Sequence, residues 1–138
     1  MKYLVDADVL SETTKPAPAA QVVEWLRAND RDLAVNPVIL GELEYGILLL
    51  PAGHRRRRLM EWFESGAASL NVVEIDLDTT AIWAKLLAEL RRKGRMMPVK
   101  DSLIAASAKQ HGLAVATRNV ADYRAAGVRI VNPFKRIS

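Results

Sequence analysis

Short apolar runs alternate with longer amphipathic stretches along the 138 residues of the chain. The apolar runs predict five strands, at residues 2–5, 33–35, 72–75, 113–117 and 128–131. Apolar side chains at helical spacing predict helices at residues 20–28, 38–50, 80–92 and 100–110, with one more around residues 59–63, after a run of arginines. Prolines and glycines separate these stretches, as at Pro37, Pro98 and Gly112.

The alternation of strands and helices predicts an α/β fold, with a central, mainly parallel β-sheet that helices cover on both faces. No repeat, linker or low-complexity stretch interrupts the pattern. We therefore expect one domain at residues 1–134, followed by a short basic tail at residues 135–138. Ligands of such sheets bind beyond the carboxyl ends of the strands, so the residues that follow the strands are the candidates for a site.

Acidic and amide side chains occupy several of these places. Asp6 comes directly after the first strand, and Asn119 and Asp122 follow the fourth. Glu42 lies in the helix after the second strand, and Asp101 opens the helix before the fourth. Strand ends and the starts of the helices that follow them share one edge of a parallel sheet, so we expect these five side chains to converge.

Some of these acids also have a purely structural interpretation. Asp8 is a candidate cap for a helix that starts near residue 9, Asp101 suits a helix N-terminus, and Asp122 suits a turn. Asp6 and Glu42 are harder to explain in this way, because both stand among apolar residues where a buried, unpaired carboxylate is costly.

Carboxylates gathered at one edge repel one another unless they bind a proton or a cation. Ligands that offer only oxygen favour a hard ion such as Mg²⁺ or Mn²⁺. The chain has no cysteine and only two histidines, at positions 54 and 111, where we expect structural or surface roles. The residues therefore point to magnesium or manganese rather than zinc.

The formal net charge is +4, and much of the basic charge is clustered at residues 54–58, 91–95 and 135–136. Such clusters attract polyanions by releasing counterions, although a solvated helix face is the alternative for any single run. The lack of cysteine fits a reducing cytoplasm. No leader opens the chain and no apolar run reaches 18 residues, so we expect a cytoplasmic protein without a membrane span.

Four segments resemble the PIN-domain toxins called VapC, the ribonucleases of VapBC toxin–antitoxin systems. They are YLVDADVLSE, NPVILGELEYGI, MPVKDSLIAASAKQHGLAVATRNVADY and VRIVNPF, in this order along nearly the whole chain. The resemblance implies a PIN-like three-layer sandwich and a metal-dependent endoribonuclease that cuts transfer or ribosomal RNA. It also implies a homodimer and a VapB-like antitoxin that blocks the site.

Carried across residue by residue, the three acids of the family fall on Asp6, Glu42 and Asp101, and the fourth position falls on Asn119 or Asp122. The resemblance implies that Asp6 and Asp101 hold Mg²⁺ (or Mn²⁺) directly, while Glu42 and Asp122 hold a second ion or orient water. Asn119 would position a metal-bound water or a phosphate.

The chain departs from the family pattern at its first motif. Ala7 replaces the usual hydroxyl residue, and Asp8 replaces an asparagine, which adds negative charge. The same residues leave two alternatives open. One is a haloacid-dehalogenase-type phosphatase with Asp6 as nucleophile, Asp8 as general acid and Thr117 as its hydroxyl residue. The other is an RNA-binding module with an inactive site.

Overall fold

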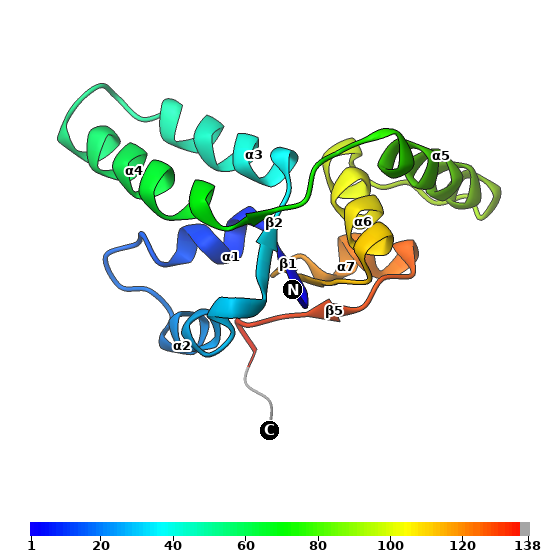
Figure 1. Cartoon of the computed structure of the whole chain (residues 1–138), viewed down its shortest axis with the longest axis horizontal. Helices are drawn as coiled ribbons and strands as arrows, with labels where there is room; N and C mark the ends of the chain where they lie inside the picture. The colour runs from blue at the N-terminus through cyan, green and yellow to red at the C-terminus, as the bar shows by residue number, and fades with distance from the viewer. Residues whose placement is uncertain (136–138) are drawn as a thin grey trace.

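The computed structural model describes residues 1–135 and places them in alternating strands and helices (Figure 1). The strands are β1 (Tyr3–Val5), β2 (Leu33–Val35), β3 (Asn71–Val72), β4 (Ala114–Ala116) and β5 (Ile130–Val131). The helices are α1 (Ala7–Glu12), α2 (Ala20–Ala28), α3 (Pro37–Leu48), α4 (His54–Ser65), α5 (Leu77–Arg92), α6 (Val99–His111) and α7 (Val120–Tyr123). Apart from Lys135, the expected basic tail lies outside the described residues.

The five strands form one sheet in the order β3-β2-β1-β4-β5, and every described pairing is parallel. The central strand β1 pairs Leu4 with Ala34 on one side and with Val115 on the other. These three side chains are completely buried, as expected for a parallel sheet that is covered on both faces. The predicted α/β class is confirmed, with a sheet that is wholly parallel rather than mainly so.

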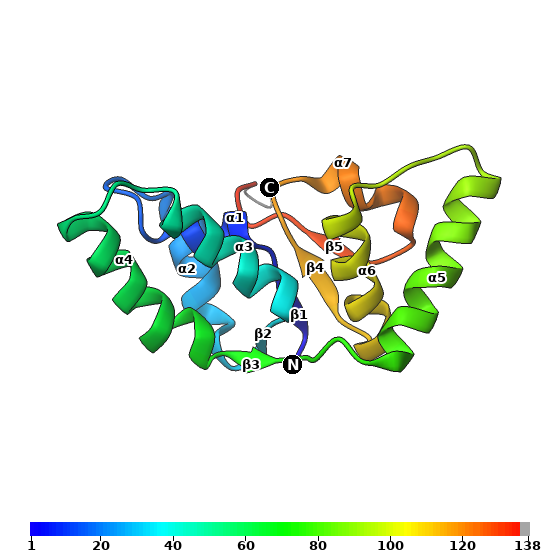
Figure 2. The same ribbon diagram turned by 90° about the horizontal axis from the view of Figure 1, so that it is seen from above.

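The helices lie in two groups on either side of the strands. The pair α3 and α4 lies on one side, and the pair α5 and α6 lies on the other, in both views (Figures 1 and 2). This arrangement is the expected three-layer sandwich. None of the helices within residues 1–135 combines the length and the hydropathy of a membrane span.

The order of the strands fixes where a site can form. From β1 the chain steps outward to β2 and β3, then crosses back to β4 and β5. The direction therefore reverses between β1 and β4, and a crevice opens there beyond the carboxyl ends of the strands. Asp6 follows β1 and Thr117 follows β4, so both residues stand at this crevice.

Side-chain caps set the helix starts that face the same edge. Asp6 caps α1 by accepting a hydrogen bond from the amide of Ala7 (2.9 Å). Asn36 caps α3 by accepting from the amide of Ile39 (2.9 Å), and Pro37 occupies the first turn. Asn36 is fully buried and donates to the Ser107 hydroxyl at 3.1 Å, which ties α3 to α6 across the sheet.

The boundaries differ from the sequence prediction in three places. Asp6, and not Asp8, caps the first helix, which therefore begins at Ala7 instead of near residue 9. The arginine run is part of α4, which begins at His54. The edge strand β3 covers only Asn71–Val72, which pair with Ala34 and Val35 of β2. The other predicted strands and helices are found within a few residues of their expected bounds.

Candidate active site

A cleft of about 610 Å³ opens at the carboxyl end of the sheet. All five predicted site residues line it: Asp6, Glu42, Asp101, Asn119 and Asp122. Its acidic end also contains Asp8 and Lys100. The convergence expected from the parallel topology is therefore present, although these residues come from segments more than a hundred residues apart in the chain.

Asp6 is the most firmly held of the carboxylates. Only 4% of the residue is exposed. One oxygen accepts from the Ala7 amide, and the other accepts from the Thr117 hydroxyl at 2.9 Å, so β1 and β4 are joined through this side chain. Burial raises the pKa of Asp6, and the nearby Glu42 carboxylate adds to the effect, while the hydrogen bond from Thr117 opposes it.

Asp101 faces Asp6 across the hydroxyl of Tyr123. The Tyr123 oxygen lies 3.4 Å from Asp6 Oδ2 and 3.3 Å from Asp101 Oδ1, and the phenol is fully buried. Both distances are long for an O–H···O bond, and one hydroxyl proton serves only one oxygen at a time. Burial, followed by the charge on Asp6, raises the pKa of Asp101 to about 6. The two carboxyl groups of Asp6 and Asp101 are therefore not neutralised by the hydrogen bonds around them.

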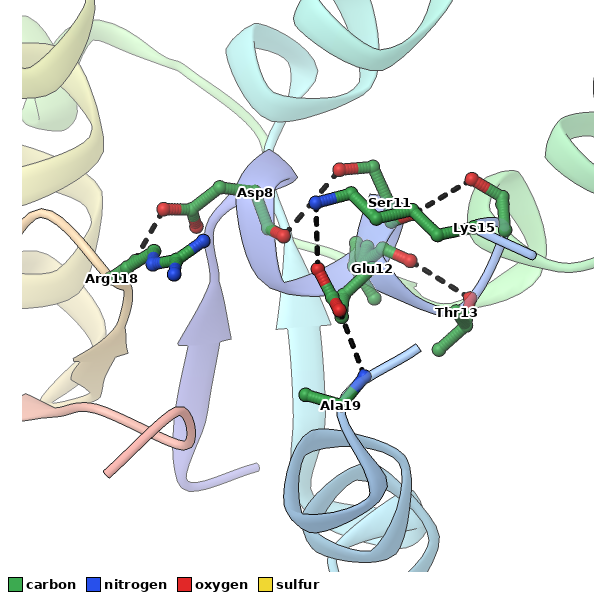
Figure 3. Close-up of polar contacts among 9 residues, drawn as sticks. Asp8, Ser11, Glu12, Thr13, Lys15, Ala19 and Arg118 are labelled. Atoms are coloured by element: carbon green, nitrogen blue, oxygen red, sulfur yellow. Dashed lines mark hydrogen bonds and ion pairs between the residues drawn. The ribbon is translucent and has the colours of Figure 1, made fainter. Parts of the chain in front are cut away.

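Asp8 brings a third carboxylate beside these two. Its Oδ2 accepts from the backbone amide of Arg118 at 3.1 Å (Figure 3), while the Arg118 guanidinium lies over the Phe134 ring instead. The other oxygen of Asp8, Oδ1, is buried and has no hydrogen-bond partner among the described residues. Burial and the charge on Asp6 raise the pKa of Asp8 to about 6. The extra carboxylate therefore adds to the negative charge at this end of the cleft.

Glu42 reaches the cleft from the middle of α3 and forms an ion pair with Lys100, in the first turn of α6. This contact explains how a carboxylate is accommodated in a largely apolar helix, since a paired charge is far less costly than an isolated one. The contact with Glu42 raises the pKa of Lys100, and the charges of Asp101 and Asp6 add to this effect.

Asn119 and Asp122 form the rim of the cleft beside α7. The amide of Asn119 donates to the Thr117 hydroxyl at 3.0 Å, which links the rim to the hydroxyl that holds Asp6. The charge on Asp122 helps to raise the pKa of Asp101. Both Asn119 and Asp122 are exposed and line the cleft, so the geometry is compatible with either one at the fourth position.

Away from the acids, the cleft continues as an apolar channel between α3 and α4. Leu43 and Ile47 line it from α3, Leu50 lines it from the segment after that helix, and Leu59 and Trp62 line it from α4. Arg55, from the arginine run, lines the same cleft and is exposed. One cavity thus combines a carboxylate cluster, an apolar wall with an aromatic ring, and a basic side chain.

The donor set fits a hard divalent cation. It consists of carboxylate oxygens and an amide, without histidine or cysteine, and it includes a buried carboxylate oxygen that lacks a partner. Within residues 1–135, however, no three acidic or histidine side chains are close enough together to hold an ion as they stand. Glu42 is engaged by Lys100, and Tyr123 lies between Asp6 and Asp101.

Several residues around the acids were not predicted to contribute to the site. Lys100 and Tyr123 are each next in sequence to a predicted site residue, which is the signal that could have identified them. Thr117 was considered only for the phosphatase alternative, and here it positions Asp6. Trp62 falls in the helix predicted around residues 59–63, and the structure shows that it lines the cleft.

The fold and the cleft together define a three-layer α/β protein with an acidic site at the topological switch point of a parallel sheet. The PIN domain family matches residues 3–128 of the chain. The chain therefore belongs to the PIN-domain family.

Relatives along the full length agree with the VapC resemblance. The VapC ribonuclease Y4jK from Sinorhizobium fredii is 33% identical over 136 residues, which cover 96% of this chain and 97% of the relative. Toxin FitB from Neisseria gonorrhoeae is 33% identical over 135 residues, which cover 95% and 97%. The crystal structure of FitAcB from Neisseria gonorrhoeae aligns with a TM-score of 0.89 at 33% identity, covering 96% of this chain and 98% of that one. The resemblance to VapC-type PIN toxins is confirmed.

The raised pKa of Asp101 predicts how the free energy of unfolding changes with pH when no divalent cation is bound. Because the folded protein holds the Asp101 proton up to about pH 6, whereas an unfolded aspartate releases it near 3.8, ionisation of Asp101 destabilises the fold as the pH rises. Asp101→Asn cannot ionise. In EDTA, its advantage in unfolding free energy over the wild type should grow by about 1–2 kcal/mol between pH 4 and pH 7.

Urea unfolding of both proteins across this pH range measures the difference. Asp78→Asn removes a carboxyl from an exposed position outside the cleft and is the matched control, and the change with pH for Asp101→Asn should exceed the change for this control. A constant difference between Asp101→Asn and the wild type would contradict the electrostatic description of the cleft.

Proposed function

We propose that the chain is a metal-dependent endoribonuclease, a VapC-like toxin that hydrolyses phosphodiester bonds of RNA with Mg²⁺ or Mn²⁺. The observation that carries the proposal is that carboxylates of the residue after β1 and of α3, α6 and α7 converge in one cleft of a PIN domain. The ribonuclease name of a full-length relative at 33% identity supports the same activity.

Asp6 and Asp101 would hold the cation directly, because both line the cleft and burial disfavours their ionised forms unless a positive charge binds beside them. Glu42 and Asp122 would hold a second ion or orient water from opposite sides of the same cleft. When bound, the cation lowers the pKa of the attacking water and offsets the charge that develops on the phosphate.

The remaining residues orient these groups and bind the substrate. Thr117 fixes the Asp6 carboxylate through a 2.9 Å hydrogen bond, and Tyr123 keeps Asp6 and Asp101 at a set separation. Asn119 is placed to hold a phosphate oxygen or a water molecule at the rim. Arg55 belongs to the basic run at the start of α4 and lines the cleft. This run would attract the RNA backbone without selecting a sequence. Whether the target is a transfer or a ribosomal RNA stays an open prediction.

Regulation by a second chain follows from the same assignment. A relative at 33% identity is a toxin by name, and a ribonuclease of this kind would stop translation unless it were restrained. The VapC resemblance implies a VapB-like antitoxin. An arginine of that partner would suit the carboxylate end, because its planar fork pairs with carboxylates. An apolar segment would suit the channel between α3 and α4. The homodimer implied by the resemblance also stays a prediction.

The two alternatives have less support. A phosphatase of the haloacid-dehalogenase type would use the same Asp6, but the family match is to a PIN domain. An RNA-binding module with an inactive site would follow from the Ala7 and Asp8 departures, yet every acid needed for a cation site still lines the cleft.

The activity is tested with purified protein and a labelled RNA. The wild type should cleave the RNA in Mg²⁺ or Mn²⁺ and lose cleavage in EDTA. Asp101→Asn should reduce the rate at least 100-fold, because it removes a charge at the cation without changing the shape of the side chain. Asp78→Asn should cleave like the wild type. Full cleavage in EDTA, or by Asp101→Asn, would rule out the proposed mechanism.

Toxicity and its control are tested in cells. Induced expression of the wild-type chain should arrest growth within a few generations, whereas Asp101→Asn at the same protein level should not. Co-expression of the VapB-like protein encoded beside the chain should restore growth. Normal growth of cells that hold abundant, folded wild-type protein without a partner would argue against the toxin assignment.

A further inference from the structure

Lys100 lines the cleft and forms an ion pair with Glu42, which is one of the proposed cation ligands. We propose that Lys100 is a built-in counter-ion that competes with the divalent cation for Glu42, so that a cation gains Glu42 only by displacing the lysine ammonium group. The inference rests on the proposed function, because it requires a cation in this cleft.

The two partners differ in how freely they can move. The Lys100 side chain is 51% exposed, whereas that of Glu42 is 24% exposed. Glu42 belongs to the middle of α3 and Lys100 to the first turn of α6, and these two helices lie on opposite sides of the strands (Figure 2). A long, half-exposed lysine can swing into water at small cost. The glutamate stays beside the other acids, so displacement moves the ammonium group and leaves the carboxylate in the cleft.

The charges of the cleft explain why a counter-ion is needed. Burial raises the pKa of Asp6, Asp8 and Asp101, and the charge of a neighbouring carboxylate adds to the effect: that of Glu42 at Asp6, and that of Asp6 at the other two. Among the ion pairs of residues 1–135, the one between Lys100 and Glu42 is the only pair within the cleft. The ammonium group of Lys100 therefore places a positive charge at the acidic end of the cleft, as a bound divalent metal ion would.

The arrangement of the acids agrees with this competition. No group of three potential ligands is assembled among the described residues, and Glu42 is the acid that a lysine holds. Freeing Glu42 would return one carboxylate to the cluster and remove one positive charge from it. Both effects favour the divalent cation. Since a partly exposed ion pair contributes only modestly to stability, the expected gain in cation affinity is about five- to tenfold.

Calorimetric titration with Mn²⁺ alone, without RNA, tests the inference. Lys100→Met should bind Mn²⁺ about five- to tenfold more tightly than the wild type. Lys109→Met removes the same charge from an exposed position of the same helix and should bind like the wild type. Lys100→Arg keeps the charge and the pairing, so its affinity should stay near that of the wild type. Unchanged or weaker binding by Lys100→Met would overturn the inference.

A double-mutant cycle with Glu42→Gln separates competition from simple repulsion. If Lys100 competes for Glu42, Lys100→Met should gain clearly less affinity in the Glu42→Gln background, where only the loss of the positive charge remains. An equal gain in both backgrounds would show that Lys100 acts only as a distant charge, which overturns the competition. Thermal melts in EDTA verify that each variant is folded.

The outcomes also separate this inference from the proposed function. If the wild type binds Mn²⁺ and Lys100→Met binds it no more tightly, only the inference fails. If the wild type binds no Mn²⁺, both the inference and the metal dependence of the proposed function fail.

Discussion

The crowding of carboxylates at one edge of the sheet is the constraint on which the rest of the site depends. Asp6, Asp8 and Asp101 are largely withdrawn from water, and the pKa of each is raised. The protein accommodates this crowding with few donors, which are the Thr117 hydroxyl, the Tyr123 hydroxyl and the Ala7 and Arg118 amides. These contacts orient the acids but do not neutralise them. Ionisation of these groups therefore lowers the free energy of unfolding, and a positive charge bound beside them would offset this loss.

The parallel topology is what produces this crowding. The chain reverses direction between β1 and β4, so residues that follow each of these strands face one crevice. For this reason the sequence was sufficient to place the acids. Strand ends can be read from apolar runs, and the carboxyl ends of parallel strands must share an edge. Asp6 after β1 and Asp122 after β4 could be placed together without knowledge of any side-chain contact.

The contacts that set the properties of the site could not be read in this way. The pairing of Lys100 with Glu42 depends on how α6 lies against α3, which no local pattern encodes. The position of Tyr123 between two aspartates depends on the packing of α7. The start of α4 was also missed, because arginines at residues 55–58 hide the apolar periodicity of that helix and are unfavourable near a helix N-terminus. Sequence patterns thus located the acids, whereas tertiary packing determined their charges and partners.

The central claim is that this acidic edge of a PIN domain binds a divalent cation between Asp6 and Asp101. Anomalous diffraction from crystals of the wild-type chain soaked in Mn²⁺ tests it most directly. The account predicts a manganese peak in contact with carboxylate oxygens of both aspartates. A chain that cleaves RNA in Mn²⁺ but shows no manganese at these two aspartates would contradict the account.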